Sequence, residues 1–355
     1  MTVVETAATI ALGVSALAGI GVGWLLDRRD PRVVMTAGSV VATASVLLWS
    51  RVHSAAALYA VFGVLGAAMA AVTYGAAFTV VAKWFTTRLT AALTAVTVAG
   101  AFASLIFSPL TESLSARLGW RDALVVLAIV LGTITIPLHL FVLRPHPPRP
   151  AVHSVATRDA LRSRVFWLLA AAFALGTFAW SAITVHLVVM LVEQGQPAAF
   201  AALAAGITGI SQLPGRLLFG PVVARFGQRA ALPVGFSVAA VGLGLLVMSQ
   251  SRAAIVTFAV LFGIGGGMMT MLSATAPAAL FGPASYGAVA GVLGACINGA
   301  RALGPLGAAA GVTALGGYLP VAAVLAAALG VTALTAPLVT GRPGLAARPR
   351  ARPAR

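Results

Sequence analysis

Hydrophobic residues run along this chain in long blocks, and polar residues gather in the short segments between them. Each block is at least about 18 residues long, enough for an α-helix to cross about 30 Å of hydrocarbon. Alternation with a period of two is absent and Ala, Leu and Gly dominate, so the pattern favours helices over strands. We therefore predict an all-α integral membrane protein with spans at residues 3–26, 33–50, 54–82, 89–111, 122–143, 165–192, 198–224, 230–249, 253–280, 286–315 and 318–339.

Composition supports a membrane protein. Hydrophobic residues make up 60% of the chain, charged residues only 8%, and the mean hydropathy is +1.01. A soluble protein carries charge on about a quarter of its residues. The net charge of +16 is not taken to indicate nucleic-acid binding, because all but two of the basic residues lie in the loops and the tail. The single cysteine, Cys296, lies within an apolar block, which excludes a disulfide framework and a cysteine metal site.

Lys and Arg are distributed unequally between the two sets of loops. One set, with the C-terminal tail, carries 17 of the 23 basic residues, the other set carries 4, and Arg216 and Arg301 fall inside spans. The positive-inside rule places the richer set in the cytoplasm. We therefore expect a monomeric, multi-pass protein of the cell inner (plasma) membrane, surrounded by lipid, with a cytoplasmic C-terminus.

The longest polar break, residues 144–164, is basic and rich in proline, as linkers are. It divides the chain into an N-terminal bundle of five spans (1–143) and a C-terminal bundle of six (165–340). The remaining residues, 341–355, consist mostly of Arg, Pro and Ala, and we expect a disordered cytoplasmic tail.

A short motif occurs twice in the chain. Near the end of the first span it reads Gly23-x-Leu25-x-Asp27-Arg28-x-x-x-Arg32. A weaker copy follows 197 residues later, with Gly220, Arg225 and Arg229 in the places of Gly23, Arg28 and Arg32, and with Ala224 in that of Asp27. A repeat of about half the chain is typical of transporters built from two similar bundles.

The motif, the span count, the linker and the repeat together resemble the major facilitator superfamily. The resemblance implies two six-helix bundles that alternate access to a central cavity. It also implies that the eleven spans are family helices 2–12, with helix 1 missing, and that the motif residues form a gating latch. The alternative is a plain basic loop, in which Gly23 and Asp27 would have no role.

Two arginines lie deep in apolar spans. Arg216 is nine residues from Arg225, and Arg301 is fifteen residues into its span. A guanidinium at mid-membrane costs at least ~2.5 kcal/mol on insertion scales, and all seven acidic residues lie near span ends or in loops. We therefore expect Arg216 and Arg301 to bind an anion, for which a carboxylate is the best match. The alternative is that each arginine bonds helix carbonyls.

The sequence around Arg216 resembles the monocarboxylate-transporter branch of the family. Arg216 and Gly220 match its Arg-x-x-x-Gly pattern, whereas its proton-carrying Asp is replaced by Gln212. Carboxylate binding then persists without that proton carrier. Asn298, one turn from Arg301, is a further candidate ligand, or else an interhelical hydrogen-bonding group. His186 is a candidate proton carrier, or else a neutral histidine with a local partner.

These features predict secondary transport of a small organic anion, with proton symport or anion exchange. One alternative is efflux of lipophilic drugs or metabolites by antiport. Another, from a different class, is a truncated membrane protein that transports nothing, such as a sensor. We expect no enzyme, no cofactor and no metal site, because no nucleophile, general base or ligand set converges in the sequence.

Overall fold

The computed structural model describes residues 3–85, 88–145, 156–282 and 285–340, apart from the side chains of 104–105, 228–229 and 337–340. Helices account for the secondary structure of these residues, and no strand occurs among them. Eleven helical segments of the described chain are long and apolar enough to cross a membrane. They coincide with the eleven predicted spans to within a few residues at most ends, so the predicted all-α membrane fold is confirmed.

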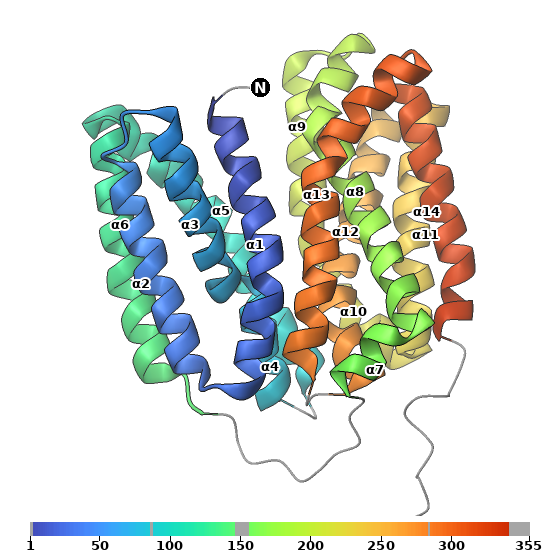
Figure 1. Cartoon of the computed structure of the whole chain (residues 1–355). Helices are drawn as coiled ribbons and strands as arrows, with labels where there is room; N and C mark the ends of the chain where they lie inside the picture. The colour runs from blue at the N-terminus through green and yellow to red at the C-terminus, as the bar shows by residue number, and fades with distance from the viewer. Residues whose placement is uncertain (1–2, 86–87, 146–155, 283–284, 341–355) are drawn as a thin grey trace, which may run out of the picture.

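The helices form two groups that stand side by side (Figure 1). The first group comprises α1 (Val3–Arg28), α2 (Pro31–Trp49), α3 (Ala55–Val72), α4 (Tyr74–Trp84), α5 (Leu89–Leu118), α6 (Trp120–Pro137) and the π-helical turn η1 (Leu138–Val142). The second comprises α7 (Thr157–Arg162), α8 (Arg164–Glu193), α9 (Ala198–Ile210), α10 (Gln212–Phe226), α11 (Gln228–Met248), α12 (Arg252–Phe281), α13 (Tyr286–Leu315) and α14 (Tyr318–Thr340).

Two of the membrane-spanning segments, which correspond to the predicted spans 54–82 and 198–224, are each divided into two α-helices. The span 55–84 breaks at Thr73, between α3 and α4, and the span 198–226 breaks at Ser211, between α9 and α10. Thr73 leaves the helical conformation, with ψ near −170°. The sequence did not predict these breaks, nor the short helix α7 within the predicted linker. Residues 146–155 of that linker and the tail at 341–355 lie outside the described residues.

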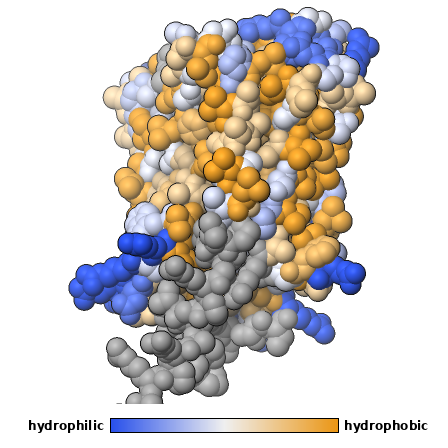
Figure 2. Space-filling model, turned by 90° about the vertical axis from the view of Figure 1, so that its right-hand side faces the viewer, coloured by the Kyte–Doolittle hydropathy of each residue, from blue (hydrophilic) through white to orange (hydrophobic). Residues whose placement is uncertain are grey.

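The outer surface carries a broad hydrophobic belt between two hydrophilic ends (Figure 2). Large apolar side chains such as Phe141, Leu303 and Leu334 are exposed in the structure. A water-soluble monomer rarely exposes a continuous apolar surface of this size, whereas lipid covers one without cost. The belt therefore agrees with helices that cross a bilayer.

Contacts between the two groups concentrate at one end of the molecule. Here α1 ends, α5 and α13 begin and the linker is attached, so we call it the linker end. The helices α1 and α13 run close together there, and α5 lies against α10 and α12. The position of these contacts gives the central space a floor at the linker end.

Candidate functional site

A cavity of about 360 Å³ lies between the two groups of helices. Its walls come from α1, α3 and α4 on one side and from α8, α10, α12 and α13 on the other. The polar part of the lining consists of Ser15, Thr73, Tyr74, Thr177, Trp180, Gln212, Thr270, Ser273, Tyr286, Asn298 and Arg301. The size falls within the range of pockets that bind small organic molecules.

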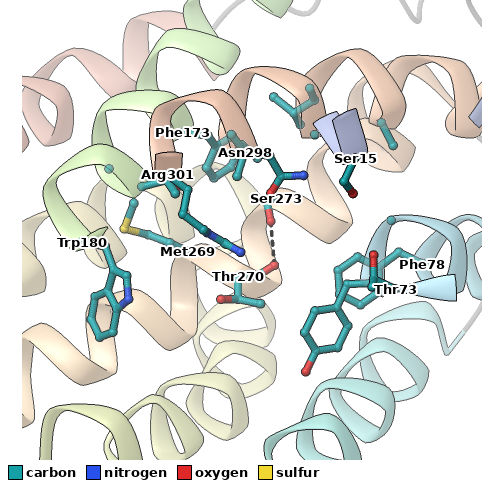
Figure 3. Close-up of a pocket in the computed structure, with 18 of the residues that line it drawn as sticks. Ser15, Thr73, Phe78, Phe173, Trp180, Met269, Thr270, Ser273, Asn298 and Arg301 are labelled. Atoms are coloured by element: carbon teal, nitrogen blue, oxygen red, sulfur yellow. Dashed lines mark hydrogen bonds between the residues drawn. The ribbon is translucent and has the colours of Figure 1, made fainter. Parts of the chain in front are cut away.

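Arg301 is the one charged side chain that lines this cavity among the described residues. It lies in the middle of α13, and its side chain is exposed to the cavity space (Figure 3). The part of the chain that the structure describes gives its guanidinium no hydrogen bond and no ion pair. Its backbone carbonyl accepts a hydrogen bond of 2.7 Å from Ser181 Oγ, which ties α13 to α8. The helix that presents this cation to the cavity is thus hydrogen-bonded to its neighbour at the same residue.

Polar groups of α12 and α13 lie near Arg301 in Figure 3. Thr270 Oγ1 donates to the Gly266 carbonyl at 3.0 Å, and Ser273 Oγ donates to the Thr270 carbonyl at 2.9 Å. Both hydroxyl groups therefore keep their lone pairs for an incoming donor. Asn298 lies one turn before Arg301, as the sequence predicted, and its amide has no hydrogen-bond partner among the described residues.

Aromatic rings form walls on both sides of the cavity. Tyr74 and Phe78 of α4 stack with ring centroids 5.1 Å apart. Opposite them, Trp180 of α8 stacks on Phe262 at 4.9 Å. A Cβ at Gly266 would lie 2.5 Å from the indole ring, so glycine at this position leaves room for Trp180. The cavity consequently combines one cation with a large apolar surface.

Arg216 has a different environment from Arg301. It is only 8% exposed, and it is not among the residues that line the cavity. Its Nη1 donates to the Thr97 carbonyl of α5 at 2.6 Å, and Nη2 lies 3.5 Å from Gln212 Oε1. Nε is buried with no partner within the described chain. The bond to Thr97 joins the two groups of helices, and Gln212 is the part of this pair that reaches the cavity.

Asp27 makes a second contact between the groups. Its carboxylate accepts hydrogen bonds from the backbone N–H groups of Gly287 (3.0 Å) and Ala288 (2.8 Å), in the first turn of α13. Lys83 Nζ lies 2.8 Å from the same carboxylate and donates to the Leu26 carbonyl. A carboxylate at a helix N-terminus satisfies free N–H groups and complements the helix dipole. Asp27 therefore closes the linker end.

The other residues of the first motif copy act around this contact. A Cβ at Gly23 would overlap the Gly287 carbonyl, so glycine is what lets α1 and α13 approach. Arg28 lies over the Trp24 ring, 4.1 Å from its centroid, and Arg32 Nε bonds the Leu143 carbonyl. Arg28 and Arg32 thus make their contacts within the first group of helices.

The second motif copy makes no comparable contact. Gly220 faces open space, and Arg225 is exposed, with no hydrogen bond or ion pair in the described part of the chain. The Arg229 side chain lies outside the described residues. Ala224 provides no carboxylate at the place of Asp27, which gives the physical reason for the difference.

His186 lies away from the cavity. Its Nε2 is 3.1 Å from the Pro305 carbonyl, and its Nδ1 is 3.4 Å from the Tyr318 hydroxyl. It therefore joins α8 to α13 and α14, and it is not part of the cavity wall.

Sequence reasoning missed several residues of the site. Lys83, which directly follows the predicted span 54–82, and the aromatic walls were not identified as residues of the site. The 197-residue repeat contained a usable signal. It pairs Ser15 with Gln212 and Thr73 with Thr270, and all four line the cavity. Polar residues at matching positions of two repeats therefore mark the central space.

Comparison with known proteins identifies the family. A family model of the Major Facilitator Superfamily matches residues 1–207 and 187–355. The "Uncharacterized 38 kDa protein in 23S RNA operon" of Thermoproteus tenax is 30% identical over 277 residues, which cover 78% of this chain and 69% of that protein. The oxalate:formate antiporter of Oxalobacter formigenes is 26% identical over 283 residues, which cover 77% of this chain and 67% of the antiporter.

Solved structures show the same fold. A variant of the E. coli fucose:proton symporter FucP superposes with a TM-score of 0.76 at 15% sequence identity, covering 94% of this chain and 90% of the symporter. The match of the family model over the whole chain, together with this fold and the cavity between two groups of helices, shows that the chain belongs to the Major Facilitator Superfamily of membrane transporters.

Proposed function

We propose that this protein is a secondary transporter of small organic anions, and that Arg301 binds the anionic group. The observation that carries the proposal is a guanidinium, free of any partner in the described structure, that is exposed to a cavity at the middle of a membrane-spanning helix. Such a charge costs at least ~2.5 kcal/mol at the centre of a bilayer. A bound carboxylate offsets that cost and matches the planar guanidinium with two parallel hydrogen bonds.

Asn298 and Gln212 complete the proposed anion site. Both amides line the cavity, and the Asn298 amide has hydrogen-bonding capacity to spare within the described chain. An amide N–H donates to a carboxylate without adding charge. Similarity to the oxalate:formate antiporter supports an anion as the substrate.

Alternating access requires the contacts at the linker end to open and close. The excess of Lys and Arg in the loops of this end supports its placement in the cytoplasm, with the C-terminus on the same side. On this proposal the structure represents a conformation closed to the cytoplasm, in which Asp27 holds α1 against α13. The bundles 1–143 and 165–340 rock against each other as units when this contact breaks.

Anion exchange is favoured over proton symport. No Asp, Glu or His side chain is among the described residues that line the cavity. When the carrier changes conformation without substrate, it must bury the unpaired Arg301 cation. When an anion is bound, the charges of the anion and Arg301 cancel. Return of the carrier with a second anion therefore has the lower barrier.

Transport by reconstituted protein tests this proposal. Proteoliposomes loaded with an unlabelled carboxylic acid are expected to take up the same radiolabelled acid, and Arg301→Gln is expected to abolish that uptake. Arg252→Gln is a matched control, because Arg252 lies at the start of α12 over the Phe200 ring, outside the cavity. Carboxylate uptake that persists in Arg301→Gln would contradict the proposal.

A further inference from the structure

We propose that the cavity selects monocarboxylates with an aromatic or similarly bulky apolar body, and rejects dicarboxylates and very small acids. This inference rests on the proposed function, because it takes Arg301 as the anion-binding group. It specifies the charge and the shape of the substrate. The number of free cations in the cavity determines the charge, and the aromatic walls determine the shape.

The cavity has one free cation for one carboxylate. Arg216 is the other arginine of the spans, and its guanidinium donates to the Thr97 carbonyl and approaches Gln212. Lys83 is paired with Asp27 at the linker end. A dicarboxylate would therefore bring its second charge to a wall of hydroxyl, amide and apolar groups. A buried charge without a counter-charge binds poorly, since it gives up its hydration without compensation.

The volume of the cavity exceeds what a very small acid fills. A cavity of about 360 Å³ has room for many water molecules. A formate or acetate ion displaces few of them and leaves the apolar walls wet. An acid with a ring displaces most of them and gains the hydrophobic contribution of the buried area.

The walls are arranged to receive a ring. Figure 3 shows Arg301 near Trp180 and Thr270, with Phe78 and Thr73 on the opposite side of the space. The stacked Tyr74–Phe78 pair comes from the first group of helices, and Trp180 comes from the second. A carboxylate at Arg301 therefore directs the body of its acid toward aromatic surfaces of both groups. Offset stacking and edge contacts with these rings favour an aromatic body.

Binding to the purified full-length protein tests the proposal directly. Thermal stabilisation in detergent is measured against acetate, phenylacetate, phenylpropanoate, oxalate, succinate and the uncharged phenylacetamide, and apparent Kd values are derived from the concentration dependence. Phenylpropanoate is expected to bind at least about 30-fold more tightly than acetate, because the ring buries apolar area. Succinate and phenylacetamide are expected to bind at least about tenfold more weakly than phenylpropanoate.

A tryptophan variant assigns the effect to the wall. Trp180→Ala is expected to weaken phenylpropanoate binding about tenfold and to leave acetate binding unchanged. Trp167→Ala is the matched control, because Trp167 is an exposed tryptophan of the same helix that does not line the cavity. The comparison of acids on the unmodified protein decides the question even if Trp180→Ala does not fold.

The outcomes separate this inference from the proposed function. If oxalate or succinate binds most tightly, and Arg301→Gln removes that binding, the monocarboxylate inference is wrong and the anion transporter stands. If acetate binds as tightly as phenylpropanoate, the inference about the apolar body is wrong. If none of the acids binds, or if Arg301→Gln binds them as well as the unmodified protein does, both proposals fail.

Discussion

Arg216 and Arg301 carry the same side chain and both lie deep in apolar spans, yet their surroundings differ. Arg301 is exposed to the central cavity with no partner in the described structure, whereas Arg216 is buried and donates to the Thr97 carbonyl of the other group of helices. A buried guanidinium that bonds a backbone carbonyl serves the contact between helices. A guanidinium without a partner is available to a ligand. The role of a membrane arginine therefore depends on its hydrogen-bond partners and not on its position in the span.

The largest effect on closure of the linker end is expected from Asp27→Ala. Asp27 and Arg216 both join the two groups of helices, so the Asp27 variant gives the value with which the Arg216 variant is compared. The change leaves the buried Lys83 without its counter-charge and the first turn of α13 without its acceptor. Loss of one partner of a buried pair costs about 3–5 kcal/mol, which destabilises the conformation closed at the linker end. A cysteine introduced as Ser15→Cys, in a Cys296→Ala background, is then expected to react with an impermeant thiol reagent from the linker side.

Asp30→Asn is the control for this experiment, because Asp30 caps α2 in the same loop and asparagine also caps helices. Equal labelling of the Asp27→Ala and unmodified proteins would contradict the role of Asp27 in closing this end.

Arg301→Gln is expected to weaken carboxylate binding by about 100-fold or more, because two charge-assisted hydrogen bonds are lost. Arg301→Lys keeps the positive charge but cannot form the two parallel hydrogen bonds of a guanidinium, so we expect an intermediate loss of carboxylate affinity of about tenfold. Thermal stabilisation by phenylpropanoate measures both variants. Equal affinities of the glutamine and lysine variants would show that charge at this position does not matter.

Arg216→Gln is expected to affect the conformation more than the ligand. Loss of a charged hydrogen bond to Thr97 costs about 1.5–3 kcal/mol, so labelling of the introduced thiol from the linker side should rise at least about tenfold. Carboxylate affinity should stay within about threefold of the unmodified protein, since Arg216 does not line the cavity. If Arg216→Gln removes binding as fully as Arg301→Gln does, and labelling does not change, Arg216 is a substrate ligand.

The smallest effect is expected from Gly266→Ala. The added methyl group would lie 2.5 Å from the Trp180 ring, so the indole must move away from its stack on Phe262. We expect about a fivefold loss of phenylpropanoate binding and no loss of acetate binding. Gly63→Ala is the control, because a Cβ at Gly63 meets no atom within 4 Å. Equal losses for both acids would indicate general destabilisation of the protein.

The sequence predicted the spans, but it selected Arg216 and Arg301 alike, and only Arg301 lines the cavity among the described residues. Uninterrupted apolar blocks have one stable form in lipid, so the helices follow from composition. Both arginines stood out because no acid accompanies either of them inside its span. The backbone partners of Arg216 and Asp27 were not predictable, because the Thr97 carbonyl and the N–H groups of the first turn of α13 are 119 and 260 residues away. Every residue has a backbone carbonyl and every residue except proline has a backbone N–H, so no sequence pattern marks these partners.

The central claim is that Arg301 binds the carboxylate while Arg216 holds the two groups of helices together. A structure of the protein with a bromine-labelled phenylpropanoate tests it most directly, since the anomalous signal of bromine places the apolar end without ambiguity. The claim predicts the carboxylate at the Arg301 guanidinium, bromine beside the Tyr74–Phe78 pair and Arg216 still bonded to Thr97. A carboxylate at Arg216, with Arg301 unoccupied, would contradict it.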